Sequence, residues 1–161
     1  MPKILPIGWF HTFMGITALV SGAIALYRYK EISLQQLSGR IYLAATLVTA
    51  ATALVIFQHG VFGPGHALAI LTLGALAAGF AAEKLRLFGR FSRYMQAVSY
   101  SATLLFHSIP AITDGLLRLP VGDPVLTSID DPVLKVGYLV LLTLYIVGIS
   151  FQLRWIKKHS T

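Results

Sequence analysis

Histidine is the residue type in this chain best suited to chemistry, because an imidazole ligates metal ions and haem iron. The five histidines are His11, His59, His66, His107 and His159. There is no cysteine, so disulfides, thiolate metal sites and cysteine nucleophiles are excluded. His159 lies in a basic tail and is assigned no role. The other four histidines are the candidate ligands.

One apolar segment carries a polar stripe around His107. Its six residues share one helical face, because they follow one another at spacings of three or four. They are Gln96, Tyr100, Thr103, His107, Pro110 and Asp114. Such a stripe in a membrane helix lines a cavity or makes hydrogen bonds to neighbouring helices, and both interpretations stay open. Asp114 is a candidate acceptor for the second nitrogen of a ligating imidazole.

Composition places these residues in a membrane. Of the 161 residues, 56% are hydrophobic and 12% are charged, against about 25% charged in soluble domains. A spanning helix needs about 20 apolar residues, and five segments meet this length: 7–27, 41–58, 66–83, 95–118 and 133–153. The sequence therefore predicts an all-α integral membrane bundle of five transmembrane helices, forming one domain over residues 1–161.

Basic residues predict the orientation of this bundle. Ten of the thirteen lysines and arginines lie in residues 28–40, 84–94 and 154–161. Cytoplasmic loops of membrane proteins are enriched in basic residues, so we expect the N-terminus outside and the C-terminus in the cytoplasm. The net charge of +7 is then explained by topology, and no nucleic-acid partner is expected. Residues 119–132 are predicted to form an ordered outer loop, with Val125, Leu126 and Ile129 against lipid or protein.

This topology brings the four candidate histidines into the outer leaflet. At a rise of about 1.5 Å per residue, His11 lies within about 6 Å of the interface and His107 about 16 Å below the end of its helix. We predict that at least three of the four histidines surround one cavity, with Tyr100 and Asp114 lining its floor and mouth.

Three functions are compatible with this cluster. In the first, His11 and His107 are the axial ligands of haem b, with His59 and His66 as an alternate pair, and the protein exchanges electrons with quinone. In the second, a divalent metal ion such as the zinc of a hydrolase is held by histidine and aspartate. The candidate metal ligands are His11, His59, His66, His107 and Asp114.

In the third function no cofactor is bound, and the chain is a non-catalytic accessory subunit packing against a larger membrane complex. The histidines would then be structural: His59 and His66 would cap helix ends, while His11 and His107 would make hydrogen bonds between helices. Whether the protein is an enzyme is left open.

Four segments of the chain resemble a known family. They are HTFMGITALVSGAIAL, LSGRIYLAATLVTA, VFGPGHALAILTL and SRYMQAVSY, between residues 11 and 100. They are similar to the DUF2306 family of small bacterial integral membrane proteins. The matching motif positions are His11, Arg40, Gly63, Pro64, His66, Arg93, Met95 and Tyr100.

The resemblance implies a helical membrane fold in the bacterial cytoplasmic (inner) membrane and supplies no reaction. Relatives often carry histidines in the loops before the GR and RYM elements. Here Gln35, Gln36, Phe91 and Ser92 occupy those neighbourhoods, so the resemblance does not carry over a site built on loop histidines.

Overall fold

The computed structural model describes residues 6–56 and 62–159, and all of its regular structure in these ranges is helical. The elements are α1 (Pro6–Tyr29), α2 (Leu37–Ala53), α3 (Pro64–Leu85), a short 3-10 helix η1 (Gly89–Phe91), α4 (Ser92–Arg118) and α5 (Pro132–Lys158). The prediction of an all-α chain with five long helices is confirmed.

The helix bounds differ most from the predicted ones at α2 and α5. Helix α2 ends at Ala53 rather than near residue 58, and Val55 and Ile56 continue as turns bonded three residues back. Helix α5 continues to Lys158 rather than ending near residue 153. The last turn of α5 is basic, and the helix dipole favours cations at a helix C-terminus. A search for apolar residues alone therefore ends this helix too early.

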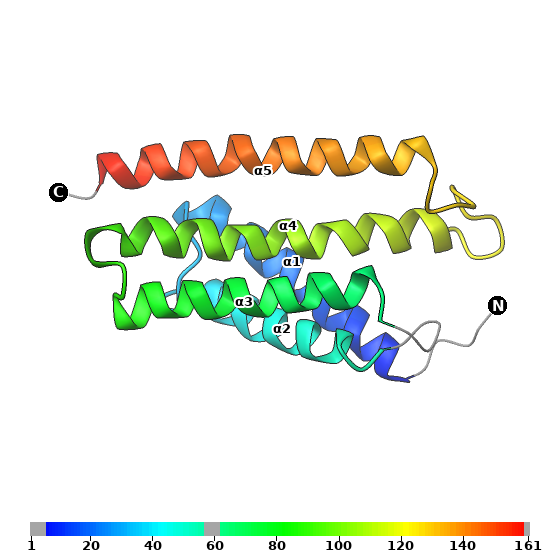
Figure 1. Cartoon of the computed structure of the whole chain (residues 1–161), viewed down its shortest axis with the longest axis horizontal. Helices are drawn as coiled ribbons and strands as arrows, with labels where there is room; N and C mark the ends of the chain where they lie inside the picture. The colour runs from blue at the N-terminus through cyan, green and yellow to red at the C-terminus, as the bar shows by residue number, and fades with distance from the viewer. Residues whose placement is uncertain (1–5, 57–61, 160–161) are drawn as a thin grey trace.

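The helices form a bundle of four with α5 along one side (Figure 1). Helices α1 and α2 pack as one antiparallel hairpin and α3 and α4 as another, while α5 packs chiefly against α4. Glycine permits the closest approaches, because a Cβ at Gly22 would overlap the ring of Tyr42 and one at Gly79 would overlap the ring of Tyr100. Small residues at helix contacts are typical of membrane bundles.

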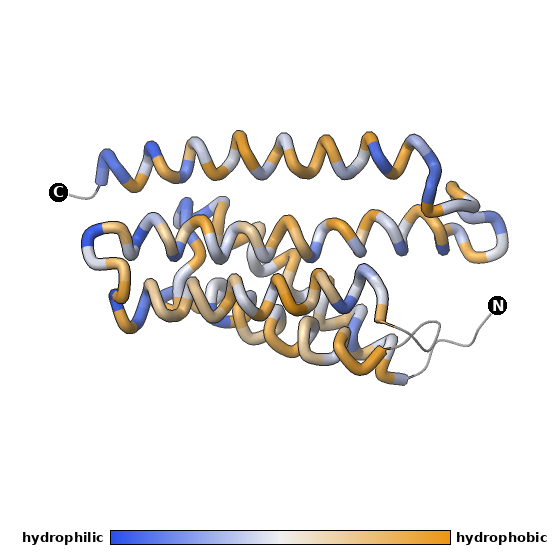
Figure 2. Tube along the Cα trace, viewed as in Figure 1, coloured by the Kyte–Doolittle hydropathy of each residue, from blue (hydrophilic) through white to orange (hydrophobic). Residues whose placement is uncertain are grey.

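Three of the described helices, α1, α3 and α5, are long and apolar enough to cross a membrane. Figure 2 shows α5 apolar along its middle, with hydrophilic residues at its ends. Helix α2 is shorter, at 17 residues, and α4 contains the polar stripe. The chain is therefore a membrane protein by the character of these three helices.

The two ends of the bundle differ in charge. We call the end formed by residues 28–40, 84–94 and 154–159 the basic end, and the end formed by residues 62–66 and 119–131 the far end (Figure 1). At the far end the connection between α4 and α5 is ordered: the amide of Leu126 donates to the carbonyl of Leu116 at 2.9 Å. Leu126 is buried, whereas Val125 and Ile129 are exposed.

Candidate functional site

His11 is held by a hydrogen bond between α1 and α2. Its Nδ1 lies 3.0 Å from the hydroxyl of Thr52. That hydroxyl has one proton, which it donates to the carbonyls of Val48 or Thr49 at 2.9 and 3.0 Å. When the Thr52 proton is used in this way, its oxygen accepts a hydrogen bond from Nδ1–H of His11. His11 then has its lone pair on Nε2, the arrangement found in histidines that ligate metals.

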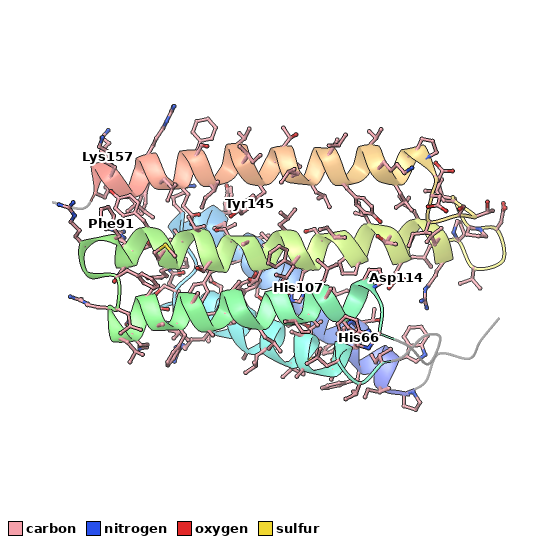
Figure 3. The ribbon with its side chains drawn as sticks, in the orientation of Figure 1. His66, Phe91, His107, Asp114, Tyr145 and Lys157 are labelled. Atoms are coloured by element: carbon pink, nitrogen blue, oxygen red, sulfur yellow. The ribbon has the colours of Figure 1, made fainter. Side chains whose placement is uncertain are left out.

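His107 is the buried imidazole of α4. Its side chain lies on the inward face of the helix with 8% of its surface exposed (Figure 3). Its Nε2 has no hydrogen-bond partner among the described residues. His11 and His107 belong to α1 and α4, which pack against each other, and a charge on His11 acts on His107. We call these two residues the histidine pair.

His66 serves a local purpose. Its Nδ1 accepts a hydrogen bond from the backbone amide of Gly63 at 3.1 Å, which caps the start of α3. Its ring stacks on Phe62 with 5.0 Å between centroids. The structural interpretation of His66 as a helix cap is therefore confirmed. The equivalent prediction for His59 concerns a residue outside the described ranges.

Asp114 pairs with another residue of its own helix. Its carboxylate forms an ion pair with Arg118, one turn further along α4, at 3.2 Å, and its side chain is 55% exposed. It interacts with His11 electrostatically across space. The predicted hydrogen bond from a ligating imidazole to Asp114 is not formed, because Arg118 is the nearer partner on the same helix face.

Within residues 6–56 and 62–159 no group of three or more histidine, aspartate or glutamate side chains is placed to hold a metal ion. His11, His66, His107 and Asp114 therefore do not make the predicted metal cluster among themselves. The physical reason is that His66 caps its own helix and Asp114 pairs with Arg118. A site with three of the four histidines would require His59.

The rest of the polar stripe makes hydrogen bonds between helices and loops. Gln96 Nε2 donates to the carbonyl of Ile32 at 2.9 Å, and Thr103 bonds the hydroxyl of Tyr42. The hydroxyl of Tyr100 donates to Glu83 at 3.1 Å. Tyr100, a predicted cofactor-binding residue, is thus engaged towards the basic end, and only His107 of the buried stripe is left unbonded at Nε2.

Glu83 was not identified from the sequence. One of its carboxylate oxygens accepts hydrogen bonds from the hydroxyl of Ser33 at 2.7 Å and the amide of Leu34 at 2.8 Å. The other accepts from Tyr100. We call this arrangement the Glu83 clamp, because it joins the α1–α2 loop to α3 and α4. A signal was present, since Glu83 is the only acidic residue of the predicted segment 66–83.

Further contacts at the basic end attach α5. Arg93 forms a two-bond ion pair with Glu31, with both distances 3.1 Å, and its guanidinium lies over the ring of Trp155. Gln152 Nε2 donates to the carbonyl of Lys30 at 2.8 Å. These contacts are structural, because each polar group is used to hold another part of the chain.

The histidine pair is therefore the candidate site. Two ring nitrogens on different helices suit a group that needs two protein ligands, such as haem iron, whereas zinc sites use three or four. Comparison of the chain with protein-family models, with curated proteins and with solved structures gives no match. The resemblance to the DUF2306 family stays a prediction.

Proposed function

We propose that this chain is a redox protein of the bacterial inner membrane in which His11 and His107 ligate a b-type haem that exchanges electrons with quinone. The observation that supports it is the buried Nε2 of His107, which lacks a partner among the described residues and lies on a helix that packs against the helix of His11. Burying a polar group without a hydrogen bond costs about 1–3 kcal/mol in proteins. Coordination to iron removes that cost.

The second imidazole has the properties of an axial ligand. Thr52 fixes the ring of His11 through Nδ1 and leaves Nε2 unprotonated. A partner at the other ring nitrogen orients a ligating histidine and raises its basicity. A bound haem would supply one-electron transfer, and His11 and His107 would hold its iron.

The direct test is the absorption spectrum of the full chain purified from haem-replete cells and titrated with haem in detergent. We expect a Soret band with low-spin, six-coordinate character. His107→Ala and His11→Ala should each abolish that character, because six-coordination needs both ligands. His66→Gln, at a buried histidine that caps α3, and His159→Ala should keep it. A colourless protein that does not bind added haem contradicts the proposal.

The full topology belongs to the same proposal. We infer that α2 and α4 also cross the bilayer, with the N-terminus outside and the basic end in the cytoplasm. The support is the concentration of basic residues at one end of the bundle. Since the chain has no cysteine, single-cysteine variants at exposed Gln35 and Thr127 can be labelled with a membrane-impermeant maleimide in whole cells. Labelling of Thr127→Cys alone is expected, and equal labelling of both contradicts five spans.

One observation favours the accessory-subunit function as a second candidate. The ordered loop at the far end exposes three large apolar side chains: Val121 at 79%, Val125 at 61% and Ile129 at 58%. A partner subunit in a larger membrane complex would cover them. Crosslinking from Thr127→Cys in native membranes should then give one discrete adduct, and replacing Val121 and Val125 by serine should remove it. Absence of any adduct contradicts this second function.

A further inference from the structure

A groove runs between α4 and α5, on a face of α4 that does not include His107. It is open to the surface, encloses about 630 Å³ and is lined by residues from α1, α4 and α5. Apolar side chains form most of its wall, among them Leu104, Leu105, Leu141, Leu144 and Ile149. Gly148 leaves it open, because a Cβ at this position would meet no atom within 4 Å.

The polar side chains of the groove already have partners. Ser101 donates to Gln152 at 2.9 Å, and Gln152 in turn donates to the carbonyl of Lys30. Ser108 donates to the carbonyl of Leu104, and the hydroxyl of Tyr145 lies 3.4 Å from the carbonyl of Val98. Ser101, Ser108, Tyr145 and Gln152 are therefore bonded within the protein, and the wall between them is apolar, which suits an apolar chain.

The dimensions of the groove identify the shape of its occupant. Along α5 it extends from Leu141 to Trp155, which is about 21 Å at 1.5 Å per residue. Its volume of about 630 Å³ is therefore spread along several turns of α5 as a long open space. This shape suits an extended hydrocarbon chain, which can lie along the whole groove from the membrane surface towards the bilayer centre. The length of about 21 Å is sufficient for the hydrocarbon depth of one leaflet, about 15 Å.

The charge at one mouth of the groove identifies the headgroup. Lys30 and Trp155 line this mouth, where α1 and α5 reach the basic end. Lys30 is exposed, and its ammonium lies over the ring of Tyr27 and donates to the Tyr27 carbonyl at 2.8 Å. Arg28, Arg154, Lys157 and Lys158 are exposed on the same end of the two helices. Tryptophan and tyrosine beside basic residues mark the headgroup level of a membrane protein.

We propose that this groove is a binding site for an anionic phospholipid, with one acyl chain between α4 and α5 and the phosphate at Lys30. The site does not depend on haem, because no ligand of the proposed haem lines it. Attraction of an anionic headgroup by a basic residue near the membrane surface corresponds to about fivefold in binding per charge.

Trp155 allows the site to be tested in the full chain. The protein has two tryptophans, so Trp9→Phe, at an exposed position in α1, leaves Trp155 as the only one. This protein is reconstituted in vesicles of phosphatidylcholine that contain increasing fractions of a lipid brominated near the headgroup. Bromine quenches tryptophan on contact. Comparing brominated with unbrominated vesicles of the same preparation removes constant quenching by any cofactor.

We expect brominated phosphatidylglycerol to half-saturate quenching at a mole fraction at least about fivefold lower than brominated phosphatidylcholine. Lys30→Asn should lower this preference about fivefold; asparagine tolerates the left-handed backbone of Lys30, whose φ is 64°. Gly148→Phe should fill the groove and remove saturable quenching. The matched control is Gly74→Phe, at an exposed glycine of α3 that also has open space.

Three outcomes overturn the proposal. Equal quenching by the two lipids would show that the groove does not select an anionic headgroup. A preference that survives in Gly148→Phe shows that the basic end attracts anionic lipid without the groove. The third outcome is that an added quinone analogue protects Trp155 from quenching by both brominated lipids. If it protects Trp155 equally well in Lys30→Asn, the groove is a quinone site.

Discussion

Glu83 and His107 are both titratable side chains inside the helix bundle, yet their surroundings differ. The carboxylate of Glu83 accepts three hydrogen bonds from the α1–α2 loop and α4, whereas Nε2 of His107 has no partner within the described residues. A buried polar group that is fully bonded stabilises a fold, and one that is unbonded lowers its stability. The comparison separates the part of the molecule that holds the fold together from the part that is open to a ligand.

Other buried polar atoms lack partners among the described residues, and they sharpen the comparison. They include the side-chain oxygens of Gln36, Ser38 and Ser92. A hydroxyl on a helix can rotate to a carbonyl of its own preceding turn, and the amide of Gln36 ends a flexible side chain that is only partly buried. The imidazole of His107 has no comparable freedom, because its Nε2 lies at the far edge of a rigid ring. His107 is therefore the residue of this set that an external ligand would satisfy.

The largest effect is expected from removing the centre of the Glu83 clamp. Glu83→Ala leaves the hydroxyls of Ser33 and Tyr100 and the amide of Leu34 without their acceptor. The loss should be about 3 kcal/mol or more of unfolding free energy, since each buried unpaired donor costs about 1–3 kcal/mol. Unfolding in mixed detergent, followed by circular dichroism, measures it. Glu31→Ala removes the ion pair with the partly exposed Arg93 and should cost about 1 kcal/mol. An equal loss in Glu83→Ala and Glu31→Ala would show that the Glu83 clamp contributes no more than this ion pair.

A smaller effect is expected from crowding the clamp. Gly79→Ala places a methyl group against the ring of Tyr100, which is buried and held through its hydroxyl by Glu83. Overpacking of this kind costs about 1–3 kcal/mol. Gly74→Ala lies on the same helix in open space and should gain up to about 1 kcal/mol from helix propensity. Stabilisation by both substitutions would show that the Tyr100 ring moves freely.

The smallest effect has the opposite sign. In protein prepared without haem, His107→Leu should raise the unfolding free energy by about 1 kcal/mol, because it replaces an unbonded imidazole by an apolar side chain. His66→Leu should lower it by about 1 kcal/mol, because it removes the cap of α3. Thermal unfolding of both variants and the unsubstituted protein in one detergent measures the sign of each change. Destabilisation by His107→Leu would mean that His107 has a hydrogen-bond partner after all.

The helices of this fold are predictable from sequence, because an apolar run of about 20 residues leaves few alternatives in a membrane. The Glu83 clamp is not, since its bonds to Ser33 and Leu34 join residues 50 and 49 positions apart. Nothing in the local pattern around Ser33 identifies α3 as its partner. The acidic residue at the end of an apolar segment was the available signal, and it indicates only that a partner is needed.

The histidine pair shows a second limit of prediction from sequence. A constant rise per residue placed His11 and His107 at depths about 10 Å apart. In the structure the helices of these two residues pack against each other, and α1 runs obliquely to α4 (Figure 1). Tilt changes the depth of a residue without changing its position in the chain, and it is set by packing against neighbouring helices. The pairing of two histidines across helices therefore appears only in the three-dimensional structure.

The bond from Gln152 to the carbonyl of Lys30 has a consequence for biosynthesis. It joins residues 122 positions apart, so it forms only after α5 has left the ribosome and inserted. Until then, the Ser101 hydroxyl also lacks its acceptor on Gln152. A chain that stalls before α5 therefore lacks both contacts, and the attachment of α5 at the basic end is the last step that the order of synthesis allows.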